Sequence, residues 1–267
     1  MKPLVVISCP ADTFSGYGAR SRDIALPLIK SGKYDVKILP QRWGSTPWGF
    51  LDNENPDHKL IKDCFLANNQ IPKQPDVWIQ ITVPNEFQPT GKFNIGITAG
   101  IETTICAAQW IEGLNRMNLN LVSSEHAKKV FQDSKFQKQD EKTKQVIGTV
   151  ELTAPIEVLF EGVDITKYFA LPLTPTSEIK QTLDEVKEDF AFLFTGHWLQ
   201  GDIFQDRKDV GGLIKIFLES FKNKSKKPAL ILKTMSGPTS IIDRDNILKK
   251  LDAIRKSVNS KNLPNIY

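Results

Sequence analysis

The sequence predicts an α/β protein built from two doubly wound parallel sheets, of which the second is incomplete. The first observation is a β-α-β unit at the start of the chain. Apolar residues 4–8 form a buried strand, residues 24–29 carry the apolar face of a helix that stops at Gly32, and residues 36–39 form the next strand.

The second observation is a strand–helix pair in the last third of the chain. The continuous apolar run Phe190–Phe194 is typical of a parallel strand covered on both faces. Residues 210–221 then repeat apolar side chains at the spacing of one buried helical face. Between the two pairs, residues 165–179 contain prolines and show little periodicity, which indicates a linker.

We therefore expect a Rossmann-like domain at residues 1–170, a linker at 171–185, and the first part of another Rossmann-like domain at 186–267. Further strands are expected at 76–83, 93–98, 119–123, 146–150, 156–160 and 229–233, with a last one beginning at 265–267. Helices are expected at 57–69, 107–114, 124–131 and 247–258, and a polar surface loop at 132–144.

Composition excludes several classes of function. The chain has 267 residues, of which 40% are hydrophobic and 25% charged, with a net charge of +4, and these are ordinary values for a globular domain. The charge is too small and too dispersed for a nucleic-acid partner. The lysine-rich run 222–227 is interpreted as a solvated helix end and loop, and attraction to phosphate or peripheral contact with a membrane surface is the minor alternative.

The cysteines and the N-terminus indicate a cytoplasmic protein. The three cysteines are scattered, without metal-ligand spacing or a disulfide framework, so we expect no metal. The apolar stretch near the N-terminus is too short for a signal peptide. No apolar run reaches the length of a membrane-spanning helix.

A glycine pair, Gly16 and Gly18, follows the first strand. Dinucleotide binding is disfavoured, because Ser21 replaces the third glycine of that fingerprint and the second strand ends without an acidic residue. Two interpretations stay open. The glycines either let backbone amides approach a ligand closely or form a tight turn and nothing more.

Glu102 follows the strand at 93–98, at the edge of the sheet where open α/β proteins bind ligands. A carboxylate there could accept a hydrogen bond from a sugar hydroxyl or act as a base. Alternatively, Glu102 supports the next helix through its dipole, with Thr103 and Thr104 as caps.

In the second domain, Gly196 follows the apolar strand, and Arg207 and Lys208 precede the helix at 210–221. A strand, a glycine and a helix N-terminus form a site for an anion. Arginine grips phosphate with two parallel hydrogen bonds, and lysine adds a point charge.

Four segments together resemble the GT-B glycosyltransferases, in particular the large retaining family that includes sucrose, glycogen and lipopolysaccharide transferases. They are Gly16–Ala19; Asn94–Thr98 with Glu102, Trp110 and Leu121–Ser124; Glu161–Asp164; and Phe194–Gly196 with Arg207–Asp209. The order and spacing of these segments over nearly the whole chain carry the resemblance.

The resemblance implies transfer of a sugar with retained configuration and without a metal. A nucleotide-sugar donor would be held by the glycine segments at Gly16, Gly18 and Gly196, and its diphosphate by Arg207 and Lys208. The acceptor, a glycan, a lipid or a small molecule, would bind the first domain. Arg207 and Lys208, together with Glu102, would act in catalysis.

Two departures from the family pattern bear on activity. Gly100 and Glu102 stand where members usually carry a histidine. The family's two glutamates separated by seven residues would lie after Tyr267, so we expect a truncated second domain. The alternative is therefore a non-catalytic module that binds a nucleotide or glycan. An epimerase is disfavoured, because no tyrosine has lysine four residues later.

Overall fold

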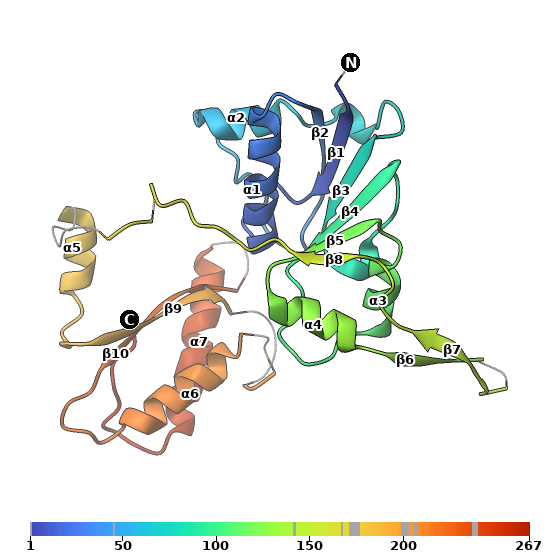
Figure 1. Cartoon of the computed structure of the whole chain (residues 1–267). Coiled ribbons are helices and arrows are strands. Elements are labelled where there is room, and N and C mark those ends of the chain that lie inside the picture. The colour runs from blue at the N-terminus through green and yellow to red at the C-terminus, as the bar shows by residue number, and fades with distance from the viewer. Residues whose placement is uncertain are drawn as a thin grey trace. The chain divides into compact units, whose positions relative to one another are not determined.

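A computed structural model describes residues 2–44, 46–140, 143–166, 168–170, 177–198, 203–205, 208–236 and 240–267. The chain divides into two compact units, Met1–Asp164 (unit 1) and Ile165–Tyr267 (unit 2). Unit 1 contains a parallel sheet flanked by helices, which confirms the α/β prediction (Figure 1).

Unit 1 is built on a six-stranded parallel sheet in the order β2-β1-β3-β4-β5-β8 (Figure 1). Its strands are β1 (Leu4–Cys9), β2 (Asp35–Pro40), β3 (Val77–Ile81), β4 (Phe93–Thr98), β5 (Leu119–Val122) and β8 (Ile156–Val158). The strands of the first domain were predicted at these places because buried parallel strands consist of short, continuous apolar runs.

Helices cover both faces of this sheet. They are α1 (Gly16–Lys30) and α2 (Pro56–Lys62) on one face, and α3 (Ala108–Leu114) and α4 (Glu125–Asp133) on the other, with the short turn η2 (Pro84–Glu86) beside α3. Alternate residues of β1 point to opposite faces. Val5 and Ile7 join the core under α1, whereas Leu4 and Val6 join the core under α3 and α4.

Three local predictions in unit 1 were wrong. Helix α1 begins at Gly16 because Ser15 caps it, so Gly16 and Gly18 belong to the first turn of the helix and not to a separate tight turn. Helix α2 ends at Lys62, because the chain then pairs with β2: Leu66 N donates to Ile38 O at 2.9 Å. The expected surface loop contains β6 (Phe136–Gln139).

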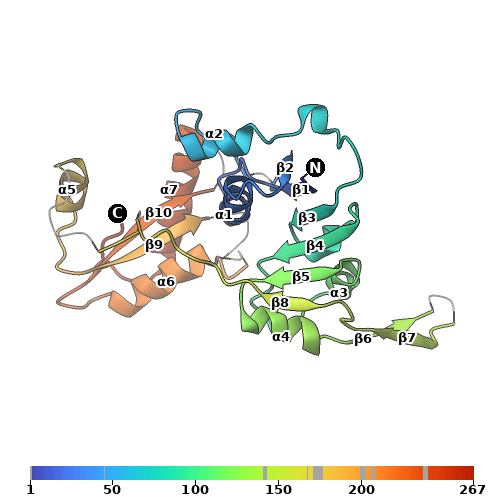
Figure 2. The same ribbon diagram turned by 45° about the horizontal axis from the view of Figure 1, so that its top comes forward.

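Strand β6 pairs with β7 (Val146–Val150) as an antiparallel hairpin, which extends beyond the edge of the sheet (Figure 2). Its turn is closed by local hydrogen bonds, including Asp140 N to Gln145 O at 3.0 Å. Local pairing of this kind needs no apolar periodicity, so the polar sequence concealed it.

Unit 2 contains the parallel strands β9 (Ala191–His197) and β10 (Ala229–Met235), with α6 (Val210–Phe221) and α7 (Ile241–Ser257) packed in one core (Figure 1). The predicted start of a strand at 265–267 is confirmed by a parallel bridge between Leu230 and Ile266. Helix α5 (Ser177–Asp184) falls inside the range expected to be the linker. None of the helices in the described part of the chain is long and apolar enough to cross a membrane.

The prediction that β9 is covered on both faces was wrong. Leu193, whose side chain points to the face opposite Phe194, is 68% exposed. The reason is that α6 and α7 share one core with Phe194 and Leu230, which lie on the same side of the strands. The apolar run identified a strand correctly, but it did not tell how many faces of that strand are covered.

Cys9 at the end of β1 gives a chemical test of the core of unit 1. It is fully buried, and burial raises the pKa of its thiol from 9.0 to about 12, against hydrogen bonds with Ser21 and Ala11 and the charge of Arg22. We expect native Cys9 to resist an aromatic disulfide reagent at pH 8 and to react only after unfolding in urea, since the thiolate is the reactive form. Half-buried Cys64 is expected to react first. Equal reaction rates for all three thiols in the native protein would contradict the structure.

The raised pKa of Cys9 makes the free energy of unfolding depend on pH. Below pH 9.0 the Cys9 thiol is protonated in both the folded and the unfolded chain, so its contribution is constant. Between pH 9.0 and about 12 only the unfolded chain loses this proton. The contribution of Cys9 to the free energy of unfolding therefore falls as pH rises through that window.

Candidate functional site

The carboxyl edge of the unit 1 sheet is the place where its topology favours a ligand. From β1 the chain moves to one side for β2, and it then returns past β1 for β3, β4, β5 and β8. In open α/β sheets, ligands bind beyond the carboxyl ends of the strands at such a reversal.

The loop from β1 to α1 is firmly held at this edge. Arg22 donates to the carbonyls of Ala11 and Thr13 at 2.8 and 3.1 Å. The carboxylate of Asp12 accepts from Leu51 N at 2.8 Å, which ties this loop to the chain that follows β2. The first turn of α1 is therefore fixed in position.

The two glycines of that turn have different roles. A side chain at Gly18 would place Cβ 2.4 Å from Thr13 O, so close packing of helix against loop requires this glycine. Gly18 N donates to Ser15 Oγ at 2.9 Å. Around Gly16, apart from chain neighbours and its own helix backbone, no described atom lies within 4 Å of an added Cβ. Packing thus explains Gly18, whereas the open space at Gly16 leaves room for a ligand near its backbone.

Tyr17 lies between these glycines, on the segment that follows β1. Its side chain contacts the segment after β2 and the segment after β4. Its ring stacks on Trp43, with 3.9 Å between ring centroids and 23° between ring planes. Its hydroxyl lies 3.0 Å from Thr98 Oγ1 and accepts from Ala99 N at 3.1 Å. Burial raises the pKa of Tyr17, the hydrogen bonds with Thr98 and Ala99 oppose the rise, and the negative charge of Glu102 adds to it.

Glu161 also raises the pKa of Tyr17, by less than Glu102 does. Glu161 follows β8, and its Oε1 is 4.0 Å from Nε of Arg20. The Arg20 guanidinium donates to the carbonyls of residues 159 and 160. Glu102 is exposed on the segment between β4 and α3. The edge thus combines a phenol, two carboxylates and a guanidinium, which suits hydrogen bonding to a hydroxyl-rich ligand.

The alternative role of Glu102 as support for the next helix was wrong. Helix α3 begins at Ala108, six positions after Glu102, and its N-cap is Ala107 without a side-chain bond. A helix dipole acts on charges within the first turn. Thr103 does not cap this helix but donates to Ile105 O at 2.8 Å.

In unit 2, the described candidate residues lie at the carboxyl end of β9 and at the start of α6. Gly196 is inside β9, and its carbonyl accepts from Thr234 Oγ1 at 2.8 Å. Lys208 is exposed two positions before α6. Arg207 lies outside the described residues.

Asp209 already occupies the N-terminus of α6. It is the N-cap in a left-handed conformation (φ 45°), and its Oδ1 accepts from Gly212 N at 3.1 Å and from Phe204 N at 2.9 Å. A carboxylate at this point competes with a bound anion for the helix amides. A phosphate would therefore depend on the cationic side chains rather than on the helix N-terminus.

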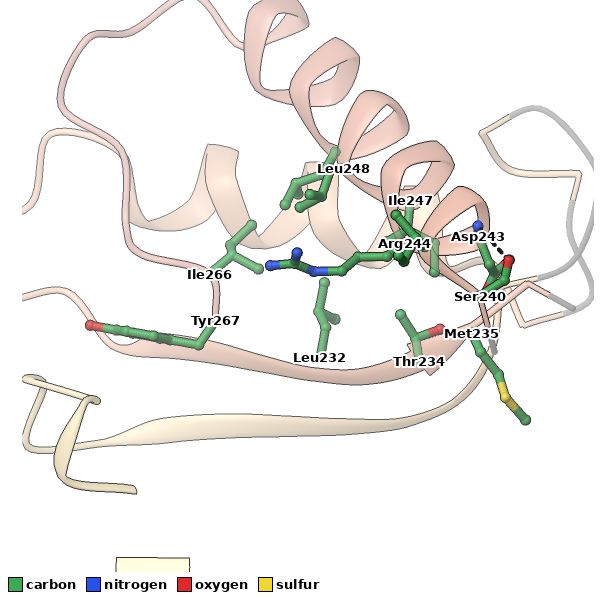
Figure 3. Close-up of a pocket in the computed structure, with 12 residues that line it drawn as sticks. Leu232, Thr234, Met235, Ser240, Asp243, Arg244, Ile247, Leu248, Ile266 and Tyr267 are labelled. Carbon is green, nitrogen blue, oxygen red and sulfur yellow. Dashed lines mark hydrogen bonds between the residues drawn. The ribbon is translucent and has the colours of Figure 1, made fainter. Parts of the chain in front are cut away.

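A separate groove of about 720 Å³ lies in unit 2 between α7, β10 and residues 266–267. Its walls are mostly apolar, and Figure 3 shows the Arg244 side chain extending over Leu232 toward Ile266. Asp243 N donates to Ser240 Oγ at 3.1 Å at one end of the groove (Figure 3). None of the predicted site residues that the structure describes lines this groove.

No group of three or more His, Cys, Asp or Glu side chains within the described ranges is arranged to hold a metal ion. No protein-family model matches the chain, and no curated protein matches it either.

Proposed function

We propose that the protein is a glycosyltransferase that moves a sugar from a nucleotide-sugar donor to a hydroxyl-bearing acceptor with retained configuration. The proposal combines the resemblance of the four sequence segments with the polar cluster at the carboxyl edge of unit 1. That cluster, in which the Tyr17 hydroxyl holds Thr98 and Ala99 on the connection that carries Glu102, is the observation that carries it.

Sugars present many hydroxyl groups, and carboxylates are strong acceptors for them. Glu102 is exposed and belongs to a connection that Tyr17 fixes through Thr98 and Ala99. It is thus accessible to a sugar hydroxyl and is anchored beside the buried strand β4. In the proposed reaction Glu102 accepts from a hydroxyl of the transferred sugar, and this hydrogen bond strengthens in the transition state as positive charge develops on the sugar ring.

The donor's leaving group is a nucleoside diphosphate, on which negative charge develops as the glycosidic bond breaks. Arg207 and Lys208 would stabilise that charge, which is electrostatic catalysis. Because Asp209 caps α6, these two side chains would supply most of the attraction for the diphosphate. Asp209 is also the observation that favours the second candidate function, a module that binds a nucleotide or glycan without turnover. Its carboxylate competes with the diphosphate for the amides at the start of α6, and the helix then contributes little to stabilising the leaving group.

Titration calorimetry with UDP-, GDP- and ADP-sugars tests the proposal. For the donor that binds, we expect the double variant Arg207→Ala/Lys208→Ala to weaken affinity about 100-fold, since each charge-assisted hydrogen bond contributes about 1.5 kcal/mol. The matched control is Lys226→Ala/Lys227→Ala, which removes two positive charges from another surface of unit 2 and should change affinity by less than about threefold.

The proposal is wrong if no nucleotide-sugar binds, or if the control pair weakens binding as much as the site pair. Release of nucleoside diphosphate separates the two candidate functions. Donor binding with release supports the transferase, and donor binding without release supports the module.

A further inference from the structure

The segments that surround the beginnings of β9 and β10 form one continuous surface of unit 2, which we call the amino edge. Because the two strands are parallel, they begin at the same edge of their sheet. The segment 222–228, which leads into β10, is bonded to the segment after α7, since Asn223 N donates to Asn262 O at 2.9 Å. Ser260 Oγ also donates to Asn223 Oδ1 at 2.9 Å, and the Lys227 ammonium donates to the Asn262 side chain.

Positive charge is concentrated at the amino edge. Two hollows of about 640 and 380 Å³ lie there. Three acidic side chains line them, against six cationic ones, which are Lys187, Lys226, Lys227, Arg255, Lys256 and Lys261. Among the residues that the structure describes, none pairs as a carboxylate with any of these six cations. In unit 1, by contrast, Lys92 and Lys128 each lie 2.7 Å from a carboxylate oxygen. The cations of the amino edge are therefore available to an external anionic partner.

Exposed phenyl rings lie beside these cations. Phe190 is 61% exposed and lines the larger hollow together with Lys226 and Lys227. Phe192, which is 44% exposed, meets Phe190 edge to face, with 5.0 Å between the ring centroids. Cations next to exposed aromatic side chains are typical of surfaces that bind at the boundary between lipid head groups and acyl chains, where both kinds of group are stabilised.

A nucleic acid is the other polyanion that positive charge attracts, and two observations disfavour it. Bases stack on open ring faces, whereas Phe190 and Phe192 are perpendicular to each other and Phe192 also packs against Phe217 and Phe221. Five of the six cations are lysines, which act as point charges, while arginine is the residue that grips a phosphate with two hydrogen bonds. Diffuse attraction to a charged surface needs no such geometry.

We propose that the amino edge of unit 2 binds the surface of an anionic lipid bilayer. The six cations lie over the anionic head groups, and the Phe190 ring enters the boundary with the acyl chains. Composition favours a solvated loop for the lysine-rich run 222–227, but the structure brings cations from two other segments and exposed rings to the same edge. The inference goes beyond the proposed function and does not depend on it, because the described candidate residues of unit 2 lie at the other end of β9.

Co-sedimentation of the full chain with lipid vesicles tests the proposal, without any nucleotide-sugar. One set of vesicles contains phosphatidylcholine alone, and the other contains phosphatidylcholine with about one third phosphatidylglycerol. We expect binding to the mixed vesicles to be at least about tenfold stronger than to the neutral ones in about 0.1 M salt. Most of this difference should disappear in about 0.5 M salt, where the charges are screened.

A pair of lysine variants tests whether the location of the charge matters. Lys226→Ala/Lys227→Ala should weaken binding to the mixed vesicles about 25-fold, since each cation near an anionic membrane strengthens binding about fivefold. The matched control, Lys33→Ala/Lys59→Ala, removes the same charge from exposed positions of unit 1 and should change binding by less than about threefold.

Variants of Phe190 test the apolar contact. Phe190→Ala should weaken binding to the mixed vesicles at least about threefold. Phe190→Trp should preserve binding, because tryptophan also favours the lipid boundary. The side chain is mostly exposed, so both variants should fold, and circular dichroism checks that they do.

The inference is overturned if mixed and neutral vesicles bind alike, if the unit 1 control weakens binding as much as Lys226→Ala/Lys227→Ala, or if folded Phe190→Ala binds as well as the parent chain. A single-stranded oligonucleotide that binds more tightly than the mixed vesicles would also overturn it. Failure of this inference is distinguishable from failure of the proposed function. Vesicle binding needs no donor, and donor binding is expected to survive the loss of Lys226 and Lys227.

Discussion

Replacing Glu102 by Gln is expected to lower the rate of donor turnover about 100- to 1,000-fold, while donor affinity changes by less than about threefold. The substitution keeps the shape of the side chain but removes its charge, and loss of a carboxylate that acts in the transition state costs a rate factor of this size. Steady-state kinetics of diphosphate release measures the rate, and calorimetry measures the affinity.

Glu54→Gln is the matched control, because it neutralises an exposed carboxylate elsewhere in unit 1. An independent readout checks the geometry. The charge of Glu102 contributes to the raised pKa of Tyr17, after the larger effect of burial. The Tyr17 pKa should therefore fall in Glu102→Gln, as followed by absorbance at high pH. Unchanged turnover in Glu102→Gln would remove this residue from the mechanism.

Replacing Gly113 by Ala is expected to lower the free energy of unfolding by about 4 kcal/mol, a large effect for one methyl group. Helix α3 lies against the turn η2 so closely that an added Cβ would be 1.8 Å from Pro84 O and 2.5 Å from Pro84 C. Both contacts are to backbone, so no side chain can rotate away. The helix would have to move and disturb the core around Ile111 and Leu114.

Urea unfolding followed by circular dichroism measures this effect. The sign of the change is informative, because helix propensity alone favours alanine over glycine by about 1 kcal/mol. Gly148→Ala is the control, since no described atom beyond its chain neighbours lies within 4 Å of its added Cβ. An alanine variant at 113 as stable as the parent would contradict the packing of α3 on η2.

The strands of unit 1 could be predicted from the sequence because burial on both faces gives an unmistakable signal. Strand β4 was predicted at its observed bounds, and all six side chains of β1 are buried. The same reasoning failed for β6, where short polar strands pair locally, and for β9, where an apolar run lies on a partly exposed sheet.

The candidate site was predicted only in part. Glu102 was selected as a candidate because it follows a strand, and in the structure its charge contributes to the raised pKa of Tyr17. Tyr17 and its stacking on Trp43 were missed, because contacts between loops that follow different strands produce no periodic pattern in the sequence. The one available signal was the position of an aromatic residue between two glycines at the first turn of a helix.

The position of Tyr17 has a consequence for how this edge of the sheet would respond to a ligand. The Tyr17 hydroxyl accepts a hydrogen bond from the backbone amide of Ala99, and the Tyr17 ring stacks on Trp43 in the segment after β2. A molecule that drew this hydroxyl away would release that amide to exchange with solvent deuterium and would loosen the chain around Trp43 as well. Occupancy of the edge would then be visible as local opening at two places far apart in the sequence, even where no atom of the ligand touches them.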